Sequence, residues 1–492
     1  MGKMSTHPVR VLQFGQGNFL RAFCDDWIDR ANACGVFDGS IVIAQSVGGK
    51  NRVFAEQNCQ YTTLLRGKAD GQIVNEARTV TSVKALVHTT DDYDAFMAYA
   101  ACPTLEAVIS NTTEAGIAYN AADTYAMTPP TGFPAKLTKF LYARYSAFDG
   151  DPDRGLVFYP TELIEKNGDA LRSCILRHAQ AWQLGQAFAD WITDACMFCN
   201  TLVDRIVTGY PKKSEDAEQI FEELGYTDAS LTVAEPFGLW VIEAEDMTRA
   251  ENVLPLNRAG LNVIFTKDLT PYRERKVRIL NGAHTSFVPA AFLSGEEIVR
   301  DCMTHPVIRP FIDACITREI IPTLRQTLAE DDLRRFAAAV CERFENPFID
   351  HALISICLNS VSKWKARVLP TVLDAYKNGT TPHGLVFSFA ALCTFYAGGV
   401  MTEDGYIGCR PVNGKSVPYT VSDSADVIAF FAAHGKDADI LFRFAAQTDF
   451  WGMNLHDIDG FVALAQTYFE KIRDDGVLSA MQDAVNAAET EE

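Results

Sequence analysis

The segment VRILNGAHTS (277–286) places polar side chains that could do chemistry inside an otherwise apolar run. Lys276 precedes the segment, and Asn281 and His284 lie within it. Burying a lysine, an amide or an imidazole costs free energy unless the group binds something. On a continuous α-helix the steps of five and three residues turn through about 140° and 300°, so all three side chains can line one edge of a cleft.

These residue types suit the interconversion of an alcohol and a carbonyl group. A lysine whose pKa is lowered by burial and by neighbouring cations can take the proton of an alcohol, and amide or imidazole groups can hold the developing oxyanion. Arg273, Arg275 and Arg278 are the cations expected to lower that pKa. The alternative is a solvated amphipathic helix with a hydrogen-bonded core histidine, and these residues alone leave both interpretations open.

A second group of residues that could bind a ligand lies in FGQGNFL (14–20). The β-rich run VRVLQF (9–14) comes before Gly15 and Gly17, and a helical pattern follows them. A dinucleotide pyrophosphate binds at such a turn, where backbone N–H groups meet the positive end of a helix. Leu20 stands where the usual fingerprint has a third glycine, so the motif alone is a weak signal.

The end of the next expected strand, SIVIAQS (40–46), bears on the choice between NAD and NADP. A carboxylate that closes this strand would bind the ribose hydroxyl of NAD. Here the strand ends in Gln45 and Ser46, and Lys50 and Arg52 follow. These residues therefore favour neither cofactor.

Strand-like runs concentrate in the first half of the chain, at residues 9–14, 40–46, 106–113 and 155–162. A hairpin is predicted at 61–80, with its turn at Asp70-Gly71. The second half has long helical patterns and few strand-like runs. This order predicts an α/β fold class, with a Rossmann-type dinucleotide-binding domain at 1–268 followed by a mainly α-helical substrate domain at 269–492.

The composition excludes several other classes of protein. With 492 residues, 48% of them hydrophobic, the chain can bury a large core. The formal net charge of -19 disfavours nucleic-acid binding. No signal peptide and no apolar run of ~20 residues is visible. The 13 scattered cysteines suit a reducing compartment, so we expect a cytoplasmic protein. We further expect a monomer that binds a small molecule and neither nucleic acid nor a membrane.

CMFC (196–199) is a lone CxxC pair, without a second pair or a histidine at ligand spacing. Structural zinc sites need four such ligands. Buried cysteines of a helix are therefore the better interpretation, and no metal site is expected.

Several stretches resemble the polyol-specific long-chain dehydrogenase/reductase family, also called the mannitol dehydrogenase family. They are LQFGQGNFLRAF (12–23), SNTTEAGI (110–117), PTELIEKNGDALR (160–172), FCNTLVDRIVTGYP (198–211), PYRERKVRILNGAHTSFVP (271–289) and RFENPFI (343–349). They span most of the chain in the order that the family has. The lysine motif and VDRI (203–206) are specific to this family.

The resemblance implies a two-domain enzyme that uses NAD and no metal, and that transfers a hydride to or from one carbon of its substrate. Lys276 would be the general acid/base, and Asn281 and His284 would orient the reacting oxygen. The implied cofactor contacts are Phe14, Gly15, Gln16, Gly17, Asn18, Phe19, Leu20, Arg21, Asn111 and Thr112. The implied substrate contacts are Glu114, Arg273, Arg278 and Lys363.

Two departures from mannitol-specific relatives bear on the substrate. The asparagine that completes the oxyanion site in those relatives is matched here by Leu163, with Glu162 before it. Their glutamate three residues before the lysine is matched by Arg273. A cation at that position suits a substrate with a carboxylate and so agrees with a uronate rather than a neutral ketose. The reaction that the resemblance implies is the interconversion of D-tagaturonate and D-altronate.

Two alternatives stay open. Motifs do not separate tagaturonate from fructuronate, so reduction of fructuronate, or of another sugar acid or polyol, is the enzymatic alternative. The alternative of another class is a sensor that binds a dinucleotide or a sugar acid without turnover. Lys276, Asn281 and His284 favour the enzyme, because a sensor has no need of a lysine that transfers protons.

Overall fold

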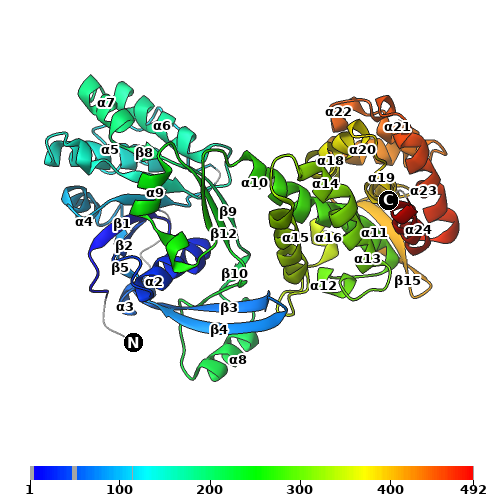
Figure 1. Ribbon diagram of the computed structural model, residues 1–492, viewed down its shortest axis with the longest axis horizontal. Coiled ribbons are helices and arrows are strands. Elements are labelled where there is room, and N and C mark those ends of the chain that lie inside the picture. The colour runs from blue at the N-terminus through cyan, green and yellow to red at the C-terminus, as the bar shows by residue number, and fades with distance from the viewer. Residues whose placement is uncertain (1–4, 47–51, 114, 491–492) are drawn as a thin grey trace. The chain divides into compact units, whose positions relative to one another are not determined.

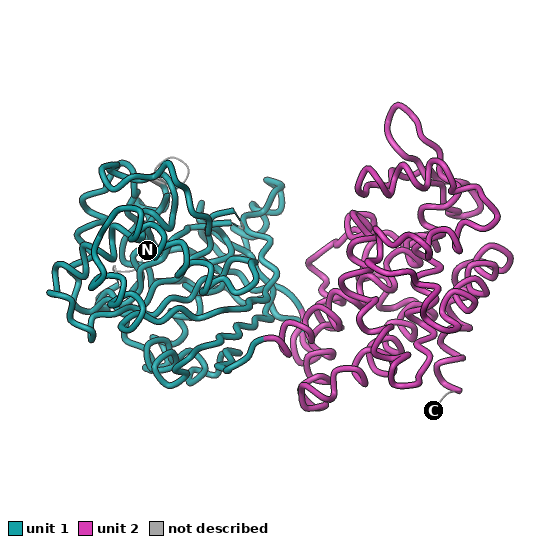
Figure 2. The backbone as a smooth tube through the Cα atoms, turned by 90° about the horizontal axis from the view of Figure 1, so that it is seen from above, with its two compact units in different colours: residues 1–67, 73–269 teal, residues 68–72, 270–492 magenta. Residues whose placement is uncertain are grey.

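The computed structural model describes residues 5–46, 52–113 and 115–490. The chain forms two compact units, which Figure 2 shows in different colours. Unit 1 comprises residues 1–67 and 73–269, and unit 2 comprises residues 68–72 and 270–492.

Unit 1 is built on a six-stranded parallel sheet in the order β5-β2-β1-β6-β7-β8 (Figure 1). Its strands are β1 (Val9–Phe14), β2 (Ser40–Gln45), β5 (Val83–His88), β6 (Ala107–Ser110), β7 (Val157–Pro160) and β8 (Met197–Phe198). The strands predicted in the first half of the chain are thereby confirmed. The strand order reverses between β1 and β6, and ligands of such sheets bind beyond the carboxyl ends of the strands at this point.

Both faces of this sheet are buried, because successive residues of a strand point to opposite sides. Val11 of β1 packs in one core with Phe23 and Trp27 of the first helical run, whereas Leu12 packs in a second core with Phe140. The helices of unit 1 are α1 (Asn18–Leu20), η1 (Arg21–Asp25), α2 (Asp26–Ala33), α3 (Arg52–Glu56), α4 (Tyr93–Ala98), η2 (Tyr99–Ala101), α5 (Phe133–Ala147), η3 (Pro152–Arg154), α6 (Asn167–Ala181), α7 (Gln186–Asp194), α8 (Ser214–Leu224), α9 (Met247–Val253) and η4 (Leu256–Ala259). Helices on both faces of a parallel sheet define the Rossmann-type architecture that the sequence predicts.

Two smaller sheets complete unit 1. One has the order β10-β11-β3-β4, and the other has the order β13-β12-β9. Their strands are β3 (Tyr61–Ala69), β4 (Gln72–Val80), β9 (Asn200–Asp204), β10 (Val207–Gly209), β11 (Thr232–Ala234), β12 (Leu239–Glu243) and β13 (Val263–Thr266). Asp70 and Gly71 join β3 to β4 and both have positive φ angles, as a two-residue hairpin turn requires. The predicted hairpin is therefore confirmed.

Unit 2 is mainly helical, as predicted. Its helices are α10 (Thr270–Arg275), η5 (Lys276–Gly282), α11 (Ala283–Ser294), α12 (Val299–Cys302), α13 (Ile308–Ala314), η6 (Cys315–Ile320), α14 (Ile321–Leu324), α15 (Glu330–Phe344), α16 (Leu353–Ile356), α17 (Ser360–Arg367), α18 (Leu369–Lys377), α19 (His383–Tyr396), α20 (Ala425–His434), α21 (Ile440–Ala445), α22 (Thr448–Trp451), η7 (Leu455–Asp457), α23 (Phe461–Asp475) and α24 (Val477–Thr490). Helix α19 is buried along nearly its whole length and packs against α11, α23 and α24. A small antiparallel sheet of β14 (Val400–Thr402), β15 (Gly405–Val412) and β16 (Lys415–Val421) was not predicted.

The tip of the β3–β4 hairpin belongs to unit 2. Glu342 of α15 accepts hydrogen bonds from the backbone N–H groups of Asp70 (3.1 Å) and Gly71 (2.6 Å). Lys68 forms an ion pair with Glu345, just beyond the end of α15. These contacts fix the tip on the C-terminal part of that helix.

The two cysteines of the CMFC motif flank strand β8 and do not lie in a helix, so the helical interpretation of this motif is wrong. Both are buried, and burial raises the pKa of Cys196 and of Cys199 to about 12. Their thiols are therefore protonated at physiological pH. Within the described residues no group of three or more His, Cys, Asp or Glu side chains could hold a metal ion.

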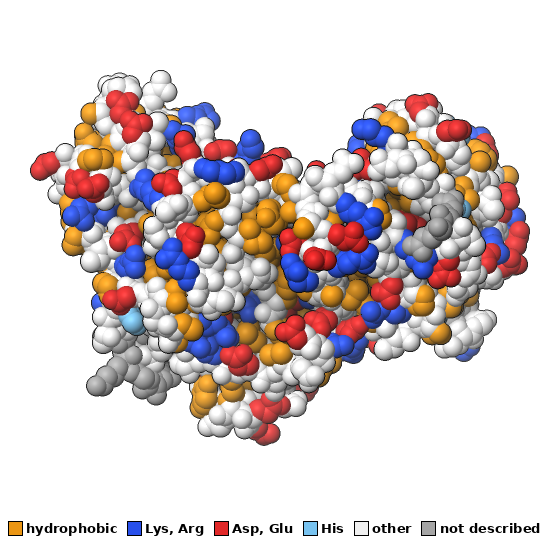
Figure 3. All heavy atoms as spheres, viewed as in Figure 1, with side chains coloured by type: hydrophobic (Ala, Val, Ile, Leu, Met, Phe, Trp, Pro, Cys, Tyr) orange, Lys and Arg blue, Asp and Glu red, His pale blue; other side chains and the backbone are white. Residues whose placement is uncertain are grey.

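The described part of the chain contains no helix that is both long enough and apolar enough to cross a bilayer. On the face shown in Figure 3, described basic side chains are interspersed with acidic ones and form no continuous basic surface.

Asp25 is a carboxyl group enclosed in the core of unit 1. It lies in η1, its exposed fraction is 0%, and its Oδ2 accepts a hydrogen bond from the hydroxyl of Tyr61 at 3.1 Å. Burial raises the pKa of Asp25 from its ordinary value of 3.8 to about 7, although Tyr61 and Arg21 oppose the shift. The folded protein thus keeps a proton that the unfolded chain loses, so this group lowers stability as the pH rises from about 4 to about 7.

We expect Asp25→Asn to raise the thermal unfolding midpoint more at pH 8 than at pH 5. The substitution removes the cost of ionising a buried carboxyl group, which is up to about 4 kcal/mol for a pKa difference of about three units. Calorimetry of wild type and variant at both pH values measures the effect. Asp94→Asn, at an exposed position of α4, is the control. The same change at both pH values would show that Asp25 ionises equally in the folded and unfolded chain.

Candidate active site

The glycine turn that follows β1 touches the loop that follows β6. Asn111 donates its backbone N–H to the carbonyl oxygen of Phe14 at 3.0 Å. Gly15 has a φ of +114°, and a Cβ at this position would lie 2.8 Å from the carbonyl oxygen of Asn111. Only glycine fits there. The close approach brings two of the expected cofactor contacts together where the strand order reverses.

Gly17 lacks a side chain for a different reason. Its backbone is extended just before α1, and, its neighbours in the chain aside, no described atom lies within 4 Å of a Cβ built on it. The fold therefore tolerates a side chain there, and glycine leaves open space at the start of the helical run. The first N–H groups of a helix have no acceptor within the helix. The residues of this turn consequently fit a dinucleotide pyrophosphate.

The remaining residues of the turn shape it. Three of the expected contacts pack their side chains in the cores of unit 1, namely Phe14, Phe19 and Leu20. Arg21 donates hydrogen bonds to the carbonyl oxygen of Gln16 (3.2 Å) and to the side-chain oxygen of Asn18 (2.6 Å). Arg21 therefore holds the turn in its conformation.

A buried carboxylate fixes the loop after β6. Oε1 of Glu162 accepts hydrogen bonds from the backbone N–H (3.0 Å) and the hydroxyl (2.9 Å) of Thr112, and Oε2 accepts one from Ser110 (3.0 Å). Burial raises the pKa of Glu162, and these hydrogen bonds oppose the shift. The next residue, Leu163, is 67% exposed. An exposed apolar side chain thus stands at the position that the sequence analysis matched to the asparagine of mannitol-specific relatives.

The end of β2 carries an amide and a hydroxyl where a carboxylate would bind the ribose of NAD. Gln45 is buried and Ser46 is partly buried. The expected substrate contact Glu114, together with Lys50 and the side chain of Arg52, lies outside the described residues.

In unit 2, Lys276 and Asn281 lie in the π-helix η5, so the assumption of a continuous α-helix is wrong for this segment. His284 follows in the first turn of α11. A π turn holds more residues than an α turn and is frequent at functional sites, so the angles expected for an α-helix do not apply here. All three side chains are partly buried on one continuous helical segment.

His284 presents a buried ring nitrogen, Nε2, that has no hydrogen-bond partner among the described residues. Its ring stacks on Phe344 with centroids 4.0 Å apart and meets His351 edge-on at 5.6 Å. Burial lowers the pKa of His284 well below its usual range, and the cationic groups around it lower it further. The imidazole is therefore neutral at physiological pH, and it can share a hydrogen bond with a substrate oxygen.

Basic side chains gather around His284. The groups concerned are His351, Arg343, Arg367 and Lys363. Lys363 donates to the carbonyl oxygen of Ile356 at 2.9 Å, and Arg367 donates to the hydroxyl of Thr285 at 3.5 Å. Neither has an ion-pair partner within the described part of the chain, and burial lowers the pKa of both. Partly buried cations without acidic partners favour the binding of an anion.

The arginines that flank Lys276 in the sequence do not belong to the group of basic side chains around His284. Nη1 of Arg278 pairs with Oδ2 of Asp374 in α18 at 2.5 Å. Arg275 is 6% exposed, and its guanidinium lies 4.4 Å from the ring centre of Phe336. Arg273 is partly buried on α10. The expected substrate contact Arg278 is thus matched by a carboxylate of the protein itself.

The sequence analysis named Lys363 but missed Arg367. The two cations are four residues apart on α17, where like charges repel, and this spacing was the available signal. A Cβ on Gly282 would lie 3.0 Å from the carbonyl oxygen of Arg367. Glycine at the end of η5 therefore lets the end of α17 approach closely.

The two units together define a class of protein. Unit 1 carries a dinucleotide-type turn at the reversal point of a parallel sheet. Unit 2 carries a lysine, an amide and a neutral imidazole beside a cluster of basic side chains. These features are those of a dinucleotide-dependent oxidoreductase that acts on a small polar substrate.

Comparison with known proteins identifies the family. Residues 9–255 match the mannitol dehydrogenase Rossmann domain, and residues 268–473 match the mannitol dehydrogenase C-terminal domain. Altronate oxidoreductase of Bacillus subtilis (strain 168) is 41% identical over 483 residues, which cover 97% of this chain and 95% of that protein. Altronate oxidoreductase of Escherichia coli (strain K12) is 39% identical over 487 residues, 97% of each chain. The chain therefore belongs to the mannitol dehydrogenase family, whose members are oxidoreductases acting on CH–OH groups, and this prediction is confirmed.

Two solved structures share the fold. Mannitol 2-dehydrogenase of Pseudomonas fluorescens is 22% identical with a TM-score of 0.64, and the match covers 99% of this chain and 96% of that one. A D-sorbitol dehydrogenase is 20% identical with a TM-score of 0.74, and the match covers 97% of both chains. At these identities the likeness concerns the fold alone.

We expect Gly17→Val to weaken binding of NADH by at least about tenfold without unfolding the protein, because a side chain enters the space left for the pyrophosphate. Fluorescence titration with NADH measures the affinity, and circular dichroism measures the fold. Gly15→Ala is the contrasting variant, and we expect it to lower thermal stability, since its Cβ meets backbone at a positive φ. Unchanged NADH affinity in folded Gly17→Val would remove the turn from the site.

Proposed function

We propose that this protein is an NAD-dependent oxidoreductase that interconverts D-tagaturonate and D-altronate. The observation that carries the proposal is the pair of partly buried cations, Lys363 and Arg367, beside the neutral His284. The carboxylate of a sugar acid would form ion pairs with these cations, neither of which has a described ion-pair partner. The altronate oxidoreductases that are 41% and 39% identical to this chain support the same substrate.

The residues of unit 1 that would hold NAD are those of the Gly15–Gly17 turn and the loop of Asn111 and Thr112. NAD, when bound, accepts or supplies the hydride. The mannitol 2-dehydrogenase structure is a ternary complex with NAD and D-mannitol, which supports NAD as the cofactor. Gly17 contributes by the absence of a side chain, and Arg21 contributes by holding the turn.

Lys276 is the general acid/base of the proposed reaction. During oxidation its Nζ takes the proton of the substrate hydroxyl, and during reduction it returns that proton to the carbonyl oxygen. Asn281 and His284 would hold this oxygen by hydrogen bonds. Because burial and neighbouring cations keep His284 neutral, the proton transfer is assigned to the lysine.

The same proposal places the enzyme in the cytoplasm as a monomer. All 13 cysteines are free thiols, which supports a reducing compartment. The cation cluster and the segment with Lys276 come from a single chain, so the proposed chemistry needs no second copy.

The test of the function is to follow NADH absorbance with tagaturonate and then with fructuronate. We expect a higher kcat/KM with tagaturonate. A higher kcat/KM with fructuronate would move the assignment to that epimer. Tight NADH binding without turnover of either compound would favour the sensor.

We expect Lys276→Ala to lower kcat by at least ~10²-fold, the lower range for a positioned acid/base, while NADH still binds. In the wild type, oxidation should rise with pH because it needs the unprotonated amine, and reduction should fall. Steady-state rates in both directions across pH measure this.

Lys377→Ala, at the exposed end of α18, is the control for loss of a lysine in unit 2. Near-normal kcat of Lys276→Ala in both directions would leave this lysine a structural cation. The acid/base role would then have to move to His284.

We expect Lys363→Met and Arg367→Met to lower kcat/KM for the uronate by about thirtyfold, corresponding to about 2 kcal/mol for a partly desolvated charge pair. For a neutral ketose the loss should be much smaller. Lys365→Met on the same helix is the matched control. Equal losses for the charged and the neutral substrate would mean that these cations do not bind the carboxylate.

A further inference from the structure

The segment RFENPFI (343–349) supplies much of the surroundings of His284. Phe344 stacks on the imidazole of His284, and the buried Arg343 is one of the basic groups that lower its pKa. His351 follows two residues after this segment. Its ring meets the ring of His284 edge-on, with centroids 5.6 Å apart and planes at 88°. The two imidazoles are therefore direct neighbours.

The backbone around His351 is fixed by the segment that leads into α12. The carbonyl oxygen of His351 accepts a hydrogen bond from the backbone N–H of Val299 at 3.0 Å. A β-bridge joins Ile298 to Ala352. The next helix, α16, packs against α11, which carries His284. The imidazole of His351 is thus attached to a well-supported backbone beside His284.

The side chain of His351 keeps both of its hydrogen-bonding nitrogens available. It is partly buried and forms no hydrogen bond with the described part of the chain. Burial lowers the pKa of His351, and the positive charge of Lys363 lowers it further. The imidazole is therefore neutral at physiological pH, so one nitrogen donates a hydrogen bond and the other accepts one.

The four basic groups around His284 differ in what they can bind. The guanidinium groups of Arg343 and Arg367 and the ammonium group of Lys363 only donate hydrogen bonds. These donors suit a carboxylate, whereas a sugar hydroxyl also carries a proton that needs an acceptor. Of the four groups, His351 alone can accept that proton in a hydrogen bond. In the proposed function His284 already holds the reacting oxygen.

We propose that His351 binds a hydroxyl group on the carbon chain of the substrate and is a specificity-determining residue. A neutral imidazole matches a hydroxyl because both groups donate and accept hydrogen bonds. This task is distinct from that of Lys363 and Arg367, which bind the carboxylate. The inference rests on the proposed function, because it takes the sugar acid to lie beside His284.

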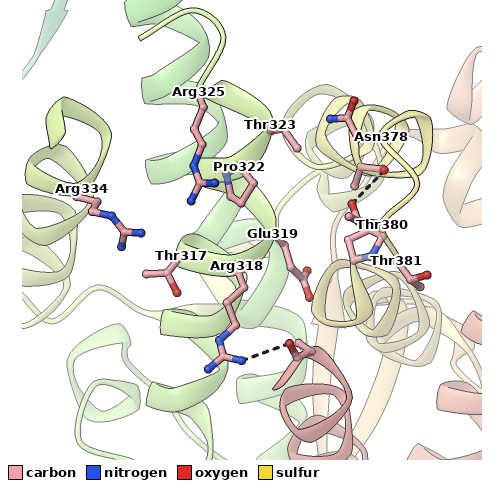
Figure 4. Close-up of a pocket in the computed structure, with 13 residues that line it drawn as sticks. Thr317, Arg318, Glu319, Pro322, Thr323, Arg325, Arg334, Asn378, Thr380 and Thr381 are labelled. Carbon is pink, nitrogen blue, oxygen red and sulfur yellow. Dashed lines mark hydrogen bonds between the residues drawn. The ribbon is translucent and has the colours of Figure 1, made fainter. Parts of the chain in front are cut away.

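A cavity of about 460 Å³ in another part of unit 2 does not offer the same chemistry (Figure 4). None of its lining residues belongs to the group around His284. Each arginine in its wall has an acidic partner, in the pairs Arg325–Glu330, Arg334–Glu330 and Arg318–Glu489. Thr381 in this wall therefore provides a control position for the loss of a polar side chain.

Steady-state kinetics of His351→Phe and His351→Gln test the inference. His351→Phe keeps a flat ring but removes both nitrogens. We expect its kcat/KM for tagaturonate to fall at least about tenfold, because a substrate hydroxyl loses its partner. His351→Leu, a second variant without polar atoms, should show the same loss. His351→Gln keeps a donor and an acceptor and should recover most of the activity.

Two control variants lose a polar side chain elsewhere in unit 2. His456→Phe removes an exposed imidazole, and Thr381→Val removes a hydroxyl from the cavity wall. Both should have the kcat/KM of the wild type. All variants of His351 should bind NADH like the wild type, since the expected cofactor contacts lie in unit 1.

The neutral ketose D-tagatose separates the binding of a hydroxyl from the binding of the carboxylate. His351→Phe should lower kcat/KM for D-tagatose by the same factor as for tagaturonate, whereas Lys363→Met should affect mainly the uronate. A loss confined to tagaturonate, wild-type kcat/KM in His351→Phe, or a His351→Gln enzyme as impaired as His351→Phe would overturn the inference.

Failure of the proposed function can be told apart from failure of this inference. If the wild type prefers fructuronate, then fructuronate and D-fructose replace tagaturonate and D-tagatose in the same comparison. If the wild type turns over neither uronate, calorimetric titration of the full chain with altronate replaces the rates. His351→Phe should then bind altronate at least about tenfold more weakly than the wild type, and equal affinity would overturn the role of His351.

Discussion

Positive charge held partly out of water is the constraint on which the proposed active site depends. Lys363 and Arg367 lie one helical turn apart on α17, where they repel each other, and burial lowers the pKa of both. Trp364 lies between the two cations in the sequence and anchors helix α17 in the core of unit 2. It is fully buried and donates a hydrogen bond to Ser388 at 2.9 Å. The packing of Trp364 thus offsets the loss of stability that the repulsion between Lys363 and Arg367 causes. In the proposed function, the carboxylate of the substrate would offset the cost of holding two cations near His284.

The parts of the fold that the sequence predicts are those set by residues close together in the chain. Strand β1 follows from its apolar run, and the hairpin follows from the turn residues Asp70 and Gly71. The pairing of Arg278 with Asp374 joins residues 96 positions apart, and no local pattern indicates it. The π-helix η5 is equally hidden, because the pattern of residues 276–282 is also compatible with an α-helix.

The turn after β1 shows how far a motif describes a site. The pattern treats Gly15 and Gly17 alike, but only Gly15 is required by the backbone around it. The space at Gly17 has no role in the fold, so it points to a ligand. The motif also groups Arg21 with the possible ligand contacts, whereas its guanidinium holds Gln16 and Asn18 in place. The sequence thus shows which residues form the turn. It does not show which of them hold the fold and which leave space for a ligand.

The hairpin tip that packs on α15 limits how genes of this family can recombine. A chimera with a single crossover near residue 269 would take the tip from one parent and its acceptors Glu342 and Glu345 from the other. If the second parent lacked these acids, the N–H groups of Asp70 and Gly71 and the ammonium of Lys68 would lose their partners. An exchange of halves with such a relative therefore has to carry the hairpin together with the helical half.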